Sequence, residues 1–224
     1  MFHLHGPALR GGALALLAAV LFGVSTPLVQ HLGAGLGAFS TAALLYAGAA
    51  GMGAVLRKPV QQEARLRRAD TSRLLAMAGL GAVVGPVALA WGLQRTSGSS
   101  ASLMLTLEAL FTALLAWRLY HETMDRRVWA AMLLLLAGGV ALVVDQGRLG
   151  GVELAGLLAV LLATMAWGAD NTLSRALAER DPAQVVVAKC VLGSCATATL
   201  AWWAHEPVPQ LGAIVGLMLV GAAG

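Results

Sequence analysis

The chain of 224 residues is 58% hydrophobic and only 12% charged, with a mean hydropathy of +0.77 and a formal net charge of +4. Soluble domains carry about 25% charged residues, so this composition excludes a water-soluble globular protein. The positive charge does not indicate a nucleic-acid partner, because the lysines and arginines cluster between apolar runs instead of covering a polar face.

Apolar runs of about 20 residues recur along the chain, which is the helical length that crosses a hydrocarbon core of roughly 30 Å. They are too long, and lack the alternation, for barrel strands. We therefore predict an all-α polytopic membrane protein whose surroundings are membrane lipid. The expected spans are residues 12–32, 36–56, 74–94, 100–120, 128–145, 153–177 and 183–203, with an eighth that begins near 210 and is unfinished at Gly224.

The first run is longer than the roughly 7 to 15 apolar residues of a secretory signal, so we expect a retained membrane helix. His3 and His5 precede it, but a single pair without further ligands does not predict a metal site. Pro27 in this span and Pro86 in the third lie inside predicted helices, where proline removes a hydrogen bond and bends the helix. Such kinks often border a binding cavity; a purely structural bend is the alternative.

Small residues recur at spacings that allow helices to approach closely. Helix packing is the expected role of these glycines, and a homodimer contact is the other option. The glycines concerned are Gly48, Gly51, Gly81, Gly85, Gly212 and Gly216.

Positive charge in the connecting segments predicts the orientation, because lysine and arginine concentrate in cytoplasmic loops. With a cytoplasmic N-terminus, twelve of the 15 basic residues fall inside, and only Arg95 and Arg148 fall outside. The sequence thus predicts an N-in protein. The inside set is Arg10, Arg57, Lys58, Arg65, Arg67, Arg68, Arg73, Arg118, Arg126, Arg127, Arg175 and Arg180.

An internal repeat emerges when Gly23 is aligned with Gly168, an offset of 145 residues that gives nine identities over 37 positions. Five predicted spans separate the two repeat starts, so the sixth span crosses in the opposite direction to the first. Inverted repeats are typical of secondary transporters. We expect a first five-helix repeat in residues 1–150 and an incomplete second repeat in 151–224.

The stretch 117–144 reads WRLYHETMDRRVWAAMLLLLAGGVALVV. It resembles the junction between the fourth and fifth helices of the EamA-type branch of the drug/metabolite transporter superfamily: Glu122, then the basic pair 126–127, then the glycine pair 138–139. Phe22-Gly23 and Trp167-Gly168 resemble the aromatic-glycine pair in the first helix of each half.

This resemblance implies ten helices in two inverted halves, transport activity, and a central cavity lined by the first four helices of each half, with the fifth peripheral. The chain departs from the pattern in two ways. Glu108 stands where many members have an apolar residue or proline, and helices nine and ten are absent.

Ionisable side chains inside a membrane span each cost about 2.5 to 3.5 kcal/mol at the centre and usually mark a pathway or a paired site. Glu108, Asp170 and Lys189 meet this condition, and Asn171 neighbours Asp170. We expect them to face a cavity that binds a polar substrate or exchanges protons. The alternative is an inert pair between Lys189 and one carboxylate. Trp167 lies deep in its span, where it could stack on substrate or serve as a core aromatic.

The sequence therefore predicts a secondary transporter, an exporter of small polar or amphipathic metabolites, in a bacterial inner membrane. It works by alternating access, with proton coupling as one option and no cofactor. A non-transporting scaffold or partial gene product is the alternative. A membrane-embedded enzyme is a weaker one, because the sequence has no HExxH motif and no glycine-rich phosphate loop.

Overall fold

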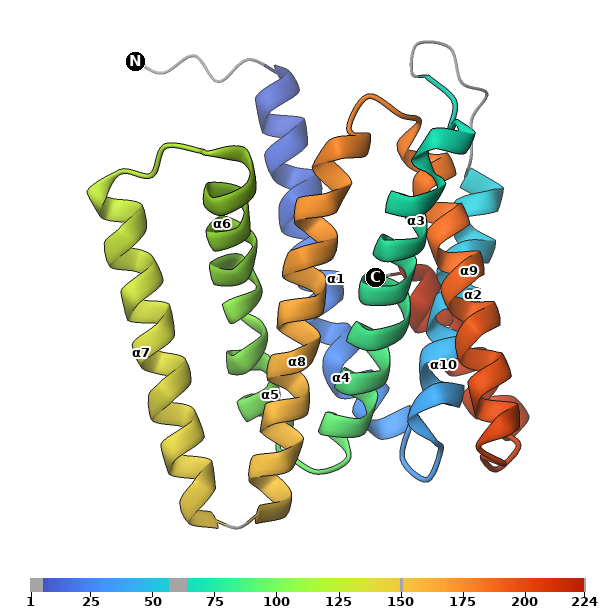
Figure 1. Cartoon of the computed structure of the whole chain (residues 1–224). Coiled ribbons are helices and arrows are strands. Elements are labelled where there is room, and N and C mark those ends of the chain that lie inside the picture. Colours follow the sequence, from blue (N-terminus) through green and yellow to red (C-terminus); the bar gives the residue numbers. More distant parts are fainter. Residues whose placement is uncertain (1–5, 57–63, 150, 224) are drawn as a thin grey trace.

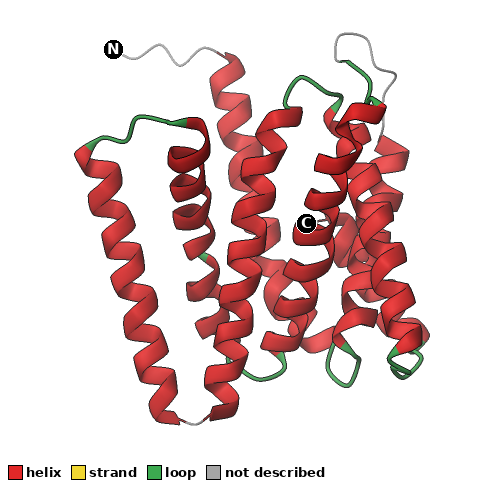
Figure 2. Ribbon diagram, in the orientation of Figure 1, coloured by secondary structure: helices red, strands yellow, loops and turns green. Residues whose placement is uncertain are grey.

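The computed structural model of the chain describes residues 6–56, 64–149 and 151–223. Regular structure in these ranges is helical, apart from one isolated bridge between Ala64 and Arg180 (Figure 2). Seven helical segments in the described ranges are long and apolar enough to span a membrane, which confirms the predicted polytopic fold. His3, His5, Arg57 and Lys58 lie outside the described residues.

The spans begin and end within a few residues of the predicted positions. Two of them are interrupted: the third contains a π-helical segment, and the fourth changes register at Thr106. The helices are α1 (Gly6–Leu32), α2 (Ala38–Leu56), η1 (Arg68–Asp70), α3 (Thr71–Met77), η2 (Ala78–Val84), α4 (Gly85–Leu93), α5 (Gly98–Leu105), α6 (Leu107–Tyr120), α7 (Arg126–Leu149), α8 (Gly151–Ser174), η3 (Arg175–Leu177), α9 (Pro182–Trp203) and α10 (Leu211–Ala223).

The π-helical segment η2 and Pro86 together leave one backbone carbonyl without a helical donor. The Gly85 N–H donates to the Leu80 carbonyl, five residues back, as in a π-helix. The next donor in that register would serve the Gly81 carbonyl, but residue 86 is a proline without an N–H. The Gly81 carbonyl is therefore left without a partner in its own helix.

Helices from the two predicted repeats pack against each other. Figure 1 shows α1 and α8 running in opposite directions. The helices α2 and α9 pack against each other, α1 packs against α10, and its counterpart α8 packs against α4 and η2. The predicted peripheral helix α7 lies at one edge of the molecule beside α6 and α8 (Figure 1).

Small residues allow the closest helix contacts. A Cβ on Gly48 would collide with the backbone of Met218, and one on Gly221 with the backbone of Leu45, so α2 and α10 touch through glycine. Gly81, Gly85 and Gly216 also face neighbouring side chains, as predicted, whereas no atom lies within 4 Å of a Cβ built on Gly51 or Gly212. The packing prediction is confirmed for four of the six glycines, and no helix contact of the other two is found among the described residues.

Candidate functional site

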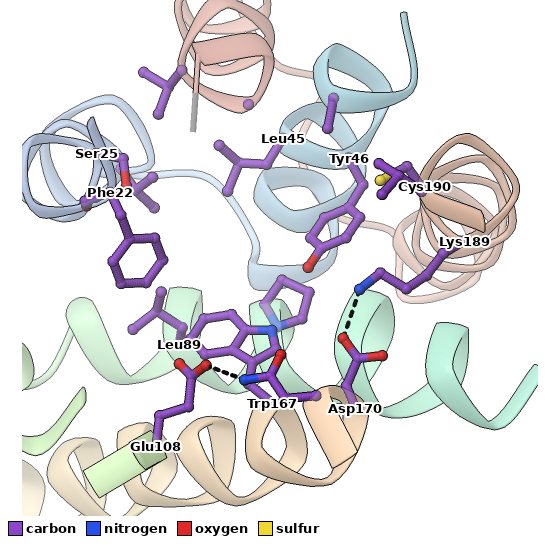
Figure 3. A pocket seen from close by; sticks show the side chains of 17 residues that line it. Phe22, Ser25, Leu45, Tyr46, Leu89, Glu108, Trp167, Asp170, Lys189 and Cys190 are labelled. Atoms are coloured by element: carbon purple, nitrogen blue, oxygen red, sulfur yellow. Dashed lines mark hydrogen bonds and ion pairs between the residues drawn. The ribbon is translucent and has the colours of Figure 1, made fainter. Parts of the chain in front are cut away.

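A cavity of about 430 Å³ lies where both halves meet, and all five predicted pathway residues line it (Figure 3). Of the two predicted kink residues, Pro86 lines the cavity, whereas Pro27 lies on the exposed side of α1 between the lining residues Ser25 and Val29. The lining residues are Phe22, Ser25, Val29, Leu45, Tyr46, Ala49, Pro86, Leu89, Glu108, Trp167, Asp170, Asn171, Val186, Lys189, Cys190, Val220 and Gly221.

The repeat offset of 145 residues places pairs of equivalent positions in this cavity. Phe22 and Trp167 are one such pair, and their rings meet edge to face with centroids 6.2 Å apart. Ser25 and Asp170 are a second pair, and both line the cavity. The cavity is therefore lined by residues of both predicted repeats at positions that the 145-residue offset relates.

An ion pair occupies one wall of the cavity. The Lys189 Nζ of α9 lies 2.6 Å from Oδ2 of Asp170 in α8, and the Asp170 side chain is 5% exposed. The sequence prediction that these two residues could pair is thus confirmed. Gly81 makes room for the pair, because a Cβ there would collide with the Asp170 carboxylate. Two opposite charges in contact leave this wall with no net charge.

Glu108 lies apart from that pair, on α6. Its Oε1 accepts a 2.7 Å hydrogen bond from Nδ2 of Asn171, which also lies 3.5 Å from the Thr112 hydroxyl. Glu108 is partly buried, and none of the ion pairs formed by the described residues includes it. Glu108 and Asn171 also line a second hollow that reaches Glu122 at the end of the span. Glu108 therefore lines both the cavity and this more open hollow on the surface.

The Gly81 carbonyl, which has no partner in its own helix, holds two side chains of the remaining cavity wall. It accepts hydrogen bonds from the Tyr46 hydroxyl of α2 and, at 2.9 Å, from Nε1 of Trp167 in α8. Sequence reasoning missed Tyr46, because the acceptor that holds it is a backbone atom released by Pro86 and η2. A lone tyrosine inside a span was the one available signal.

Arg175, in η3 directly after α8, and Glu122, just after α6, form an ion pair outside the cavity. The Arg175 guanidinium also lies 4.8 Å from the ring centre of Tyr120. Arg175 lies near a helix end, where its long stem can carry the charge to the membrane interface. The ion pair links the C-terminal ends of α6 and α8.

Comparison with known proteins gives a family and a relative. The family model described as the EamA-like transporter family matches residues 9–144. An uncharacterized transporter of Methanothermobacter thermautotrophicus is 32% identical over 123 residues, which cover 54% of this chain and 36% of that protein. The match therefore spans about a third of the length of this curated relative.

Proposed function

The chain belongs to the EamA-like transporter family, and from that membership we propose a secondary transporter that moves small amphipathic metabolites by alternating access. We place it in a bacterial inner membrane with its N-terminus in the cytoplasm, and take export as its direction. The distribution of basic residues supports the orientation.

The observation that carries the proposal is the charge distribution in the cavity. Asp170 and Lys189 neutralise each other, whereas the Glu108 carboxylate has an amide partner and no cation among the described residues. A carboxylate in a membrane span is stabilised by a proton or by a bound cation. Glu108 is thus placed to bind either one, and exchange between the two would couple transport to proton movement.

The walls around Glu108 indicate the shape of the substrate. Phe22, Leu89 and Trp167 present apolar surface to the cavity. A substrate with an ammonium group and a flat apolar body would meet both features, because aromatic rings also attract cations. The proposed substrate class is therefore small amphipathic amines, including zwitterions.

Counterflow in sealed proteoliposomes tests this function. Vesicles loaded with unlabelled tyramine are mixed with labelled tyramine, and 4-ethylphenol and 4-hydroxyphenylacetate serve as neutral and anionic analogues. We expect protein-dependent counterflow of the amine above that of protein-free liposomes, and a smaller response to the two analogues. Absence of counterflow for this amine and for a wider panel of zwitterions contradicts transport by this chain. Chemical turnover in detergent would instead favour an enzyme.

A further inference from the structure

Two groups of contacts tie the halves of the molecule together, one at each end of the antiparallel pair α2 and α9. At one end, the segment 64–70 docks on the turn between α8 and α9. At the other, Glu206 docks on the N-terminus of α2. Figure 1 shows the α8–α9 turn and the α9–α10 turn at opposite ends of the bundle. We name these contacts the Arg180 latch and the Glu206 latch.

The Arg180 latch consists of a buried ion pair and backbone pairing. Arg180 Nε lies 2.8 Å from Asp70 Oδ2, and the Asp70 side chain is only 6% exposed. The Ala64 N–H donates to the Glu179 carbonyl and the Asp181 N–H donates to the Ala64 carbonyl. Strand-like pairing of this kind fixes the two segments in register, so they must separate together when this face opens.

The Glu206 latch is a carboxylate bound to a helix N-terminus. Oε1 of Glu206 accepts from the Phe39 N–H at 3.1 Å, and Oε2 accepts from the Ser40 N–H at 2.7 Å. The first N–H groups of a helix lack partners in the helix, and a negative charge is favourable there. Gly37 permits the approach, because a Cβ at that position would collide with the carboxylate.

The two latches occupy equivalent places in the two halves. The repeat offset relates 37–40, which receives Glu206, to 182–185, which follows Arg180 at the start of α9. Both latches join a segment that follows one of the paired helices to the N-terminal end of the other. Tyr46 in α2 and Lys189 in α9, which line the cavity, lie between them along these helices.

We propose that the two latches are the alternating gates of the cavity, so that release of the Arg180 latch opens one membrane face and release of the Glu206 latch opens the other. This inference rests on the proposed transport function and names the residues that would control access. Both latches are formed in the structure. Weakening either latch shifts the population toward the state that is open at its own face.

Cys190 provides an internal reporter of access. Its side chain lines the cavity and is 4% exposed, and Cys195 is the other cysteine of the chain. In a Cys195→Ala background, a membrane-impermeant thiol reagent is applied to intact cells and, separately, to inverted membrane vesicles. We expect Glu206→Gln to raise the labelling rate of Cys190 from one side only, and Asp70→Asn to raise it from the other side only. Each effect should be on the order of tenfold, as for the loss of one hydrogen bond to a charged group.

Second variants keep the test decisive where a first one folds poorly. Gly37→Ala disturbs the Glu206 latch from the opposite element, and Gln184→Ala removes the oxygen that accepts from the Leu66 N–H beside the Arg180 latch. Each second variant must raise the labelling rate of Cys190 from the same side of the membrane as the first variant at that latch. Unchanged labelling, or equal acceleration from both sides by either latch, overturns the proposal.

The outcome is separable from that of the transport assay. Side-specific labelling without counterflow of any tested compound supports the gates and refutes the proposed function. Counterflow without side-specific labelling refutes the gates and leaves the function in place. A Cys190→Ala, Cys195→Ala double variant supplies the labelling blank.

Discussion

At the scale of single residues, the cavity holds a neutralised pair and a carboxylate that has no counter-ion among the described residues. The pair joins α8 to α9, and the carboxylate lies on α6. A charge inside a membrane span singled out these residues in the sequence. The sequence identified Glu108, Asp170 and Lys189 because their chemistry is unusual in an apolar helix. It could not identify the Gly81 carbonyl, since every residue has one and only the local helix register frees it.

The Asp170–Lys189 pair should stabilise the contact between α8 and α9. Removing one member leaves the other charged and buried, which destabilises a protein by about 3 to 5 kcal/mol. We therefore expect Lys189→Met and Asp170→Asn each to lower the melting temperature and the expression level in detergent-solubilised samples. The swapped double variant Asp170→Lys, Lys189→Asp should recover part of the loss. A swap no better than the single variants would show that the pair does not hold this interface.

At the scale of elements, the spans could be predicted and their interruptions could not. Span limits follow from runs of apolar residues, which the membrane makes obligatory. The π-helical segment η2 and the break at Thr106 are changes of backbone hydrogen-bond register inside continuous apolar runs. Hydropathy carries no information about either change.

The glycines of α2 offer a matched test of helix packing. Gly48 faces the backbone of Met218, whereas a Cβ on Gly51, one turn away, would meet no atom within 4 Å. We expect Gly48→Ala to destabilise the protein by about 1 to 3 kcal/mol through overpacking. Gly51→Ala should be neutral, or stabilising by up to about 1 kcal/mol through helix propensity. Thermal unfolding in the same detergent compares the two, and equal melting temperatures would contradict the α2–α10 contact.

At the scale of the whole molecule, helices from the two predicted repeats lie side by side, as α2 does with α9 and α1 with α10. The weak sequence match at an offset of 145 residues proved informative, because Phe22 and Trp167, aligned on that basis, meet in the cavity. The contacts between halves could not be predicted, since Glu206 and Arg180 are ordinary loop charges until folding brings their partners near.

The N-in orientation makes a separate prediction. In a background without Cys190 and Cys195, we expect an impermeant thiol reagent to label Val208→Cys in intact cells and Thr123→Cys only after lysis. Both positions are exposed in loops, at opposite faces of the predicted topology. The reverse pattern would assign the basic loops to the outside.

The most direct measurement of the central claim is tyramine counterflow by Glu108→Gln in sealed proteoliposomes. The matched control is Glu153→Gln, a carboxylate in the first turn of α8 that does not line the cavity. Glutamine keeps the size of the side chain and an oxygen for Asn171 but removes the charge. We expect normal insertion of both proteins, loss of counterflow in Glu108→Gln and wild-type counterflow in Glu153→Gln. Wild-type counterflow in Glu108→Gln would contradict a role for this carboxylate in transport.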